Sequence, residues 1–137
     1  MAKNVLVDAG FLVAVLNNRD THHRWAAAQA GGLPPPWSTC ESVLSEACHL
    51  LGRRGAPSLC AMLRRSALIV PFELAKNWEA VTRLIEKYSN VPMSLADACL
   101  VRMTETFADP MVLTTDKDFR VYRRHSRQVV PCITPEG

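Results

Sequence analysis

The sequence predicts an α/β protein built on a mostly parallel sheet. Three runs of apolar, mostly β-branched residues have the length of strands: KNVLVD (3–8), SALIVPF (66–72) and MVLTT (111–115). Segments with the apolar spacing of helices separate these runs, and the connections are too long for hairpins. The strands should therefore be parallel, and such sheets carry ligand sites at the carboxyl ends of their strands.

Length and composition fit one soluble domain covering residues 1–137. Of the 137 residues, 48% are hydrophobic and 21% are charged, a balance typical of globular proteins and not of disordered ones. No stretch reaches the ~18 apolar residues of a membrane span, and the N-terminal apolar run is too short for a signal peptide. We therefore expect a cytoplasmic protein with no membrane association.

The cysteines and the net charge fit this location. The five cysteines are odd in number and widely spaced, and none forms a CxxC pair, which predicts reduced, buried thiols. The net charge of +3 permits a polyanionic partner without indicating one.

Capping residues and apolar spacing predict the remaining elements. Helices are expected over residues 11–16, 20–30, 38–51, 57–66, 74–88 and 94–107, and a proline-interrupted edge strand over 128–133. Asp20 or Thr21 should cap the second helix, and Gly52 should end the third. Three prolines make residues 31–37 a connection that is neither helix nor inner strand.

Acidic residues follow two of the predicted strands. Asp8 ends the first strand and Asp116 follows strand 111–115, so both carboxylates are expected at the same edge of the sheet. Asp is also a frequent cap and turn residue, and Asp8 fits a helix cap and a site equally well. Asp118, at the start of KDFRVYRR, is readily explained as the cap of a short helix.

Two further acids lie toward the inner side of predicted helices. Glu46 projects beside the apolar stripe of its helix, whereas Glu41 points to the opposite face and suits the helix dipole as a solvated residue. Asp97 follows Ser94 at the spacing of a capping box, yet it projects toward the core. A carboxylate bordering a buried face needs a partner, and several acids at one sheet edge repel one another unless a divalent metal neutralises them.

Four motifs occur in order along the chain: LVDAGFLVAVL (6–16), VLSEACHLL (43–51), SLADACLV (94–101) and VLTTDKDF (112–119). Together they resemble the PIN-domain family, in particular its short VapC-type toxins, over nearly the whole chain. The resemblance implies a three-layer α/β/α sandwich, an RNA-cleaving site that uses Mg²⁺ or Mn²⁺, a homodimer and a small antitoxin partner. Gly10 departs from the pattern, because many members carry Ser or Thr there, so a hydroxyl near the metal is expected to be missing.

The resemblance also implies residue roles. Asp8, Glu46, Asp97 and Asp116 match the catalytic acids; Asp8, Asp97, Asp116 and the accessory Asp118 match metal ligands. Glu46 would hold a metal-bound water or a second metal. Thr115 is a candidate for substrate or water contact, a role that Thr114 also fits, although a threonine at a strand end needs no such role.

A basic stretch follows these acids. Arg120, Arg123 and Arg124 are candidates for binding RNA phosphate, although such a run also fits a solvated face. The adjacent His22 and His23 would point about 100° apart on a helix, which favours surface or capping roles over a shared site. Asp20 is interpreted in the same way, with only the resemblance suggesting an orienting role near the site.

Two other functions stay open at this point. A non-catalytic module of the same fold would hold nucleic acid or a partner protein without cutting it. A phosphatase with an aspartate nucleophile is disfavoured, because Gly10 stands where such an enzyme needs a second acid.

Overall fold

The computed structural model describes residues 3–136, so residues 1, 2 and 137 of the predicted domain lie outside the described part. Its centre is a five-stranded sheet in the order β3-β2-β1-β4-β7. The strands are β1 (Asn4–Val7), β2 (Trp37–Ser38), β3 (Leu68–Ile69), β4 (Pro110–Leu113) and β7 (Cys132–Ile133). All four neighbouring pairs are parallel, which confirms the predicted parallel sheet.

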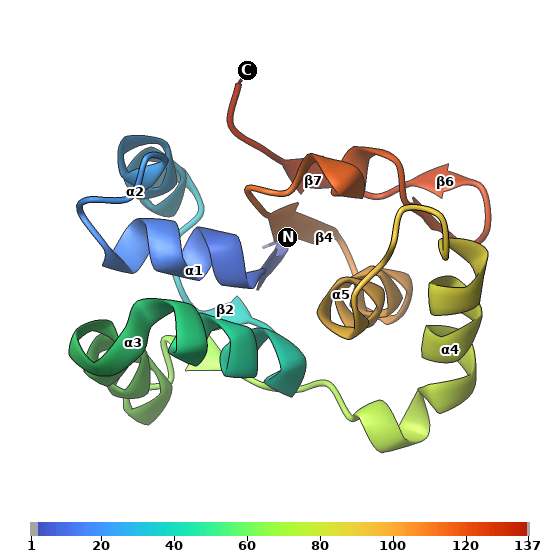
Figure 1. Ribbon diagram of the computed structural model, residues 1–137, viewed down its shortest axis with the longest axis horizontal. Coiled ribbons are helices and arrows are strands. Elements are labelled where there is room, and N and C mark those ends of the chain that lie inside the picture. The colour runs from blue at the N-terminus through green and yellow to red at the C-terminus, as the bar shows by residue number, and fades with distance from the viewer. Residues whose placement is uncertain (1–2, 137) are drawn as a thin grey trace.

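Helices flank the sheet and complete the three-layer α/β/α arrangement (Figure 1). They are α1 (Ala9–Leu16), α2 (His23–Gly32), α3 (Glu41–Arg64), α4 (Trp78–Lys87) and α5 (Leu95–Thr106), with short 3-10 helices η1 (Leu74–Lys76) and η2 (Lys117–Arg120). Helix α1 contacts α2 and α3, while α5 contacts α4 and β4. Strands β5 (Arg123–Arg124) and β6 (Gln128–Val129) form a separate antiparallel pair.

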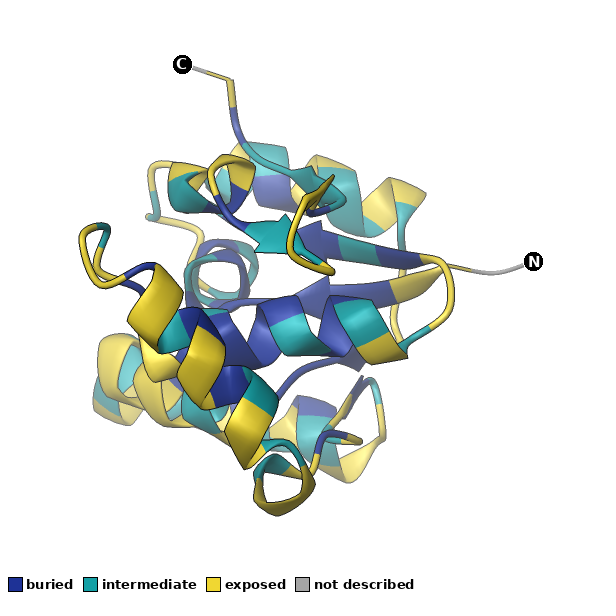
Figure 2. Cartoon of the chain, turned by 90° about the vertical axis from the view of Figure 1, so that its right-hand side faces the viewer, coloured by how far each residue is buried: buried dark blue, intermediate teal, exposed yellow. Residues whose placement is uncertain are grey.

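The core lies between the sheet and the inner faces of the helices (Figure 2). Strand β1 is central, and Val5, Leu6 and Val7 are all buried, as expected for an inner parallel strand covered on both faces. Phe11 of α1 packs edge-on against Trp25 and Trp37, with ring centroids 5.8 and 5.2 Å apart. This aromatic group joins the first turn of α1 to α2 and β2.

The region between residues 20 and 41 differs most from the prediction. Helix α2 begins at His23, because the Asp20 carboxylate accepts a hydrogen bond from the His22 N–H (2.8 Å) in a turn that precedes the helix. Residues 37–38 form the inner strand β2, contrary to our expectation of a simple connection. The prolines end at Pro36, so the Trp37 N–H is free to donate to the Ala67 carbonyl (2.9 Å).

Other boundaries shift for local reasons. The backbone does leave the helix at Gly52 (φ 67°), as predicted, but helix resumes at once and continues through Pro57 to Arg64. The expected helix 74–88 is divided into η1 and α4. Pro131 separates β6 from β7, which places the two halves of the expected edge strand in different sheets.

The cysteine side chains are only partly as buried as the sequence predicts. All five cysteines are free; Cys40 and Cys99 are buried as predicted, but Cys48 lies exposed on α3.

Within residues 3–136, no helix combines the length and the apolar character needed to cross a membrane.

Candidate active site

A pocket of about 270 Å³ opens at the carboxyl ends of β1 and β4, between the starts of α1 and α5 and the side of α3. Its wall contains all four acids predicted to be catalytic: Asp8, Glu46, Asp97 and Asp116. They come from four segments far apart in the sequence. The fold therefore gathers around one space the carboxylates that strand ends and helix faces had indicated.

Asp8 is both the cap of α1 and a wall of the pocket. Its Oδ1 accepts a hydrogen bond from the Phe11 N–H (3.0 Å), and its Oδ2 accepts one from the Thr114 hydroxyl. The residue is only 7% exposed. Burial raises the pKa of Asp8 to about 7, although the hydrogen bonds from Thr114 and Phe11 lower it, and the neighbouring Asp97 and Asp116 raise it further.

Thr114 connects the two strand ends. It is fully buried, donates its hydroxyl proton to Asp8, and accepts a hydrogen bond from the Asp116 N–H (2.9 Å). The Asp8 carboxylate is thereby tied to the backbone at Asp116. Sequence reasoning left Thr114 as an alternative to Thr115, because a threonine ending a strand gives no local sign of such a contact.

Asp116 caps η2, the short helix that follows β4. Its Oδ1 accepts a hydrogen bond from the Asp118 N–H (2.9 Å). The expectation that Asp118 caps this helix is therefore wrong, because the helix begins at Lys117, one residue earlier. Asp118 is half-buried and does not line the pocket.

Asp97 is held from both sides at the start of α5. Its N–H donates to the capping hydroxyl of Ser94 (3.0 Å), and its Oδ2 accepts a hydrogen bond from the hydroxyl of Tyr122 (2.8 Å). Burial and the charge of Asp116 raise the pKa of Asp97, while the Tyr122 hydrogen bond lowers it. Burial, followed by the bond to Asp97, raises the pKa of Tyr122, so this hydroxyl stays a donor.

Tyr122 itself is a site residue that the sequence did not reveal. It is fully buried and packs edge-on against Tyr88 and Phe119, with ring centroids 5.1 and 5.2 Å apart. The hydrogen bond to Asp97 spans 25 positions of the chain. Neither motif nor periodicity predicts a contact of that range.

Glu46 reaches the pocket from α3, together with Val43 and Leu50. It lies beside the buried Val43, as expected, but its own side chain is exposed, so the expectation that its carboxylate needs a partner is wrong. Glu41, one and a half turns earlier, is exposed and does not line the pocket, as expected. Glu46 is thus the solvent-facing carboxylate of the four.

A family model described as the PIN domain matches residues 5–124. The chain belongs to the PIN-domain family. Its fold is similar to the crystal structure of Mycobacterium tuberculosis VapC20, a sarcin–ricin loop-cleaving toxin, with a TM-score of 0.77 and 23% sequence identity over 86% of this chain and 94% of that chain. No curated protein matched the sequence.

The arginines of this PIN domain do not line the acidic pocket. Arg120 donates to the Thr134 hydroxyl, and Arg123 Nη1 donates to the carbonyl oxygens of residues 120, 121 and 122 (2.8, 3.0 and 2.9 Å). Arg124 donates to the Thr104 carbonyl oxygen. All three guanidinium groups therefore have structural partners, and their contact with RNA phosphate stays a prediction.

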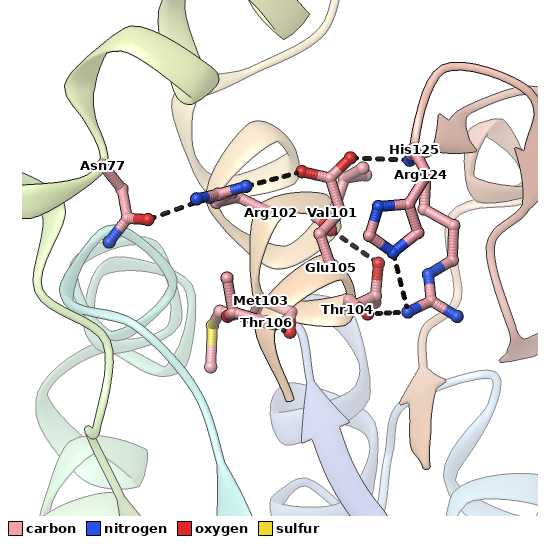
Figure 3. A network of polar contacts seen from close by, with 9 residues as sticks. All are labelled: Asn77, Val101, Arg102, Met103, Thr104, Glu105, Thr106, Arg124 and His125. Atoms are coloured by element: carbon pink, nitrogen blue, oxygen red, sulfur yellow. Dashed lines mark hydrogen bonds and ion pairs between the residues drawn. The ribbon is translucent and has the colours of Figure 1, made fainter. Parts of the chain in front are cut away.

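Figure 3 shows Arg124 within a polar network on α5. Arg102 binds both Asn77 (2.9 Å) and Glu105 (3.2 Å), and the second oxygen of Glu105 accepts from the His125 N–H (2.7 Å). These contacts anchor the turn between β5 and β6 to α5 and to the segment before α4. None of these residues lines the acidic pocket.

Asp20, His22 and His23 also lie outside the pocket lining. His23 Nδ1 lies 2.7 Å from the Ala14 carbonyl oxygen, and Asp20 bonds to the His22 N–H. The expected cap of α2 by Asp20 or Thr21 is wrong, because His22 is the N-cap residue and its side chain makes no capping hydrogen bond, while both histidines are half-buried outside the pocket.

The acids of the PIN domain fit a hard divalent cation by their chemistry. Within residues 3–136, no three Asp, Glu, His or Cys side chains lie close enough to enclose a metal ion by themselves. Mg²⁺, however, keeps several waters and is usually held by one or two carboxylates. The groups that lower the raised pKa values of Asp8 and Asp97 are hydrogen-bond donors, and no lysine or arginine of the described chain lines the pocket. A bound cation would supply the positive charge that the buried Asp8 and the half-buried Asp97 lack.

Proposed function

We propose that this PIN domain is an endoribonuclease that requires Mg²⁺ or Mn²⁺. The observation that carries the proposal is the single pocket that gathers Asp8, Glu46, Asp97 and Asp116 at the carboxyl edge of the sheet. Carboxylates alone repel a phosphodiester, so a site of this composition suits RNA only when a cation is shared between acids and substrate. Membership of the PIN-domain family supports the same reaction class.

The roles of the residues follow from their environments. Asp8, Asp97 and Asp116 would hold the cation, while Thr114, Tyr122 and the Phe11 N–H keep these carboxylates oriented. When bound, the cation lowers the pKa of a water molecule and stabilises charge that develops on the phosphate. Glu46, exposed to solvent, would orient the attacking water. Asp118 as a metal ligand stays a prediction from the family resemblance.

We also propose a cytoplasmic toxin that forms a homodimer and is inhibited by a small antitoxin protein. The fold likeness to VapC20, itself a toxin, supports this assignment. Large apolar side chains that remain exposed, such as Trp78 (53%) and Val129 (63%), offer surface for protein contacts.

A fluorogenic RNA cleavage assay tests the proposed reaction. Purified protein is expected to cleave RNA in Mg²⁺ or Mn²⁺, to lose cleavage in EDTA, and to regain it when excess Mg²⁺ is added. Full cleavage in EDTA would contradict the metal-dependent mechanism.

Two glutamates on α3 supply a matched comparison in the same assay. Glu46→Gln should lower kcat by about 10- to 100-fold, since it removes an acceptor for water at the pocket. Glu41→Gln makes the same chemical change outside the pocket and should leave cleavage unaltered. Equal rates for the two variants would remove Glu46 from the mechanism.

Tyr122→Phe should weaken the site without removing any acid. The change deletes the hydrogen bond to Asp97 (2.8 Å), so we expect cleavage to fall about 10-fold and stability to fall by about 1 kcal/mol. The Mg²⁺ concentration for half-maximal cleavage should rise, because Asp97 is less well oriented. This shift, measured by Mg²⁺ titration, is the result that a purely structural role would not produce.

The second tyrosine of the chain is the control. Tyr88 packs against Tyr122, but its hydroxyl accepts from the Arg123 N–H (2.8 Å) and bonds to none of the pocket acids. Tyr88→Phe should therefore cost similar stability and leave the Mg²⁺ dependence unchanged. An identical Mg²⁺ shift in both variants would show that Tyr122 acts only through packing.

A further inference from the structure

Gly10 and Thr115 face each other at the wall of the acidic pocket, one in the first turn of α1 and the other in the loop after β4. A Cβ atom placed on Gly10 would lie 2.1 Å from Thr115 Oγ1, 3.4 Å from Thr115 Cβ and 3.6 Å from Asp8 Oδ1. Non-bonded atoms do not approach to 2.1 Å. The Thr115 hydroxyl therefore occupies the space of the side chain that residue 10 lacks, a space we call the Gly10 socket.

Backbone geometry does not explain this glycine. Gly10 lies within α1, and Gly52 is the glycine with positive φ in the described chain. Glycine inside a helix is disfavoured by about 1 kcal/mol relative to alanine. Gly31 and Gly32 of α2 have no atom within 4 Å of an added Cβ, and at Gly55 of α3 the nearest atom, Leu51 Cβ, lies at 3.0 Å. The 2.1 Å contact at position 10 is therefore the shortest at any glycine of the described chain. Glycine there is explained by the room that it leaves for Thr115.

The hydroxyl in the socket differs from its neighbours. Thr114 bonds to Asp8 and to the Asp116 N–H, and the Ser94 hydroxyl accepts from the Asp97 N–H. The Thr115 hydroxyl has no hydrogen-bond partner among residues 3–136. The charged groups of the pocket wall are carboxylates, which are acceptors when ionised. The Thr115 hydroxyl is thus a hydrogen-bond donor available to a ligand in a pocket whose charged groups are acceptors.

We infer that Thr115 donates a hydrogen bond from the Gly10 socket to a non-bridging oxygen of the scissile phosphodiester. This inference rests on the proposed ribonuclease function and adds a specific contact to it. Hydrogen bonds to an ionised phosphate are stronger than neutral ones, and their strength depends on the donor being held in place. Gly10 is the positioning residue, because any side chain there would displace the hydroxyl.

Single variants test the contact by steady-state cleavage in Mg²⁺. Thr115→Val keeps the shape but removes the donor, so kcat/KM should fall about 10- to 100-fold with little change in melting temperature. Thr115→Ser should retain most activity. Thr106→Val, at the exposed end of α5, is the control for a remote threonine.

Gly10→Ala tests the socket. The added methyl group would clash with Thr115 Oγ1, which can move by rotation of the Thr115 side chain. The variant should therefore fold with the Thr115 hydroxyl displaced. Cleavage should drop as far as in Thr115→Ala. Gly32→Ala, which adds the same methyl group to open space on α2, should leave cleavage unchanged.

Double variants distinguish an interaction between positions 10 and 115 from a general loss of stability. In wild-type background Gly10→Ala should lower the melting temperature, whereas in a Thr115→Ala background it should raise it, since the clash is gone and alanine favours helix. Gly10→Ser combined with Thr115→Ala returns a hydroxyl from the opposite side and should recover part of the lost cleavage.

The outcomes distinguish this inference from the proposed function. If wild type cleaves RNA and Thr115→Val cleaves equally well, the phosphate contact is overturned alone. If Gly10→Ala lowers the melting temperature equally in both backgrounds, the socket is overturned. If wild type and Asp8→Asn are equally inactive in Mg²⁺, the proposed function fails, and the phosphate contact fails with it.

Discussion

Asp8→Asn is expected to abolish RNA cleavage and, at the same time, to stabilise the metal-free protein. Cleavage should fall by roughly 10³-fold or more, because a central carboxylate of the proposed cation site is lost. The stability of the folded state should rise, because asparagine buries no charge and its Oδ1 still accepts from the Phe11 N–H (3.0 Å). Asparagine loses the hydrogen bond donated by Thr114, which offsets about 1 kcal/mol of this gain. We expect the free energy of unfolding in EDTA to rise by about 1–3 kcal/mol at pH 8.

The pH dependence of this gain has a definite sign. The pKa of Asp8 is about 7 in the folded protein against 3.8 for an ordinary aspartate. Below pH 4 both states carry the proton, and the substitution should change stability little. Between pH 4 and pH 7 the unfolded chain loses its proton while the folded one keeps it, so wild-type stability declines and the gain from asparagine grows. Above about pH 7 the difference should level off.

Urea denaturation in EDTA at pH 5 and pH 8 measures both quantities, and the cleavage assay measures the loss. Asp109→Asn is the matched control, because Asp109 is an exposed aspartate paired with Lys3 (3.3 Å) and remote from the pocket. It should change neither cleavage nor stability appreciably. Wild-type stability equal to or above that of Asp8→Asn at pH 8 would show that the buried carboxylate is not destabilising.

Phe11→Ala should produce the largest loss of stability. The ring is fully buried between Trp25 and Trp37, and its removal leaves a cavity at the junction of α1, α2 and β2. We expect the free energy of unfolding to fall by about 3–5 kcal/mol, as for other buried Phe→Ala changes. Alanine keeps the N–H that binds Asp8, so cleavage should fall only at temperatures near unfolding, where the first turn of α1 is lost with the rest of the fold.

Urea denaturation of wild type and variant measures this difference in the free energy of unfolding from the shift in midpoint, provided that the m-value is unchanged. Trp78→Ala provides the control, because Trp78 is a large aromatic residue that is 53% exposed on α4. Its removal should change stability by less than about 0.5 kcal/mol. A loss below 1 kcal/mol in Phe11→Ala would mean that the aromatic group does not organise the start of α1.

Features with a local physical cause could be predicted from the sequence. Ser94 caps α5 because its hydroxyl accepts a hydrogen bond from the N–H three residues later. Gly52 interrupts α3 because glycine, unlike residues with a Cβ atom, adopts positive φ without strain. By contrast, β2 has two residues and follows three prolines, so its own sequence carries almost no strand signal. Its place is set by pairing with β1 and β3 on either side.

The acids of the site were predictable for a similar reason. Strand ends and helix faces locate Asp8, Asp97 and Asp116, because these positions depend on short-range periodicity. What holds the acids is not local: Thr114 reaches Asp8 across 106 positions, and Tyr122 reaches Asp97 across 25. The exposure of Glu46 and the anchoring of Arg124 on Thr104 also depend on how the helices pack, which no single segment encodes.

The pairing of β1 with β4 has a consequence for synthesis of the chain. Residues 4–7 are synthesised more than a hundred residues before their neighbours at 110–113, and Thr114, Asp116 and Tyr122 come later still. A nascent chain therefore carries Asp8 with neither its hydroxyl partner nor the facing carboxylate. The proposed RNA-cutting centre is therefore inactive in a nascent chain until residues 110–122 have been synthesised and have folded against β1.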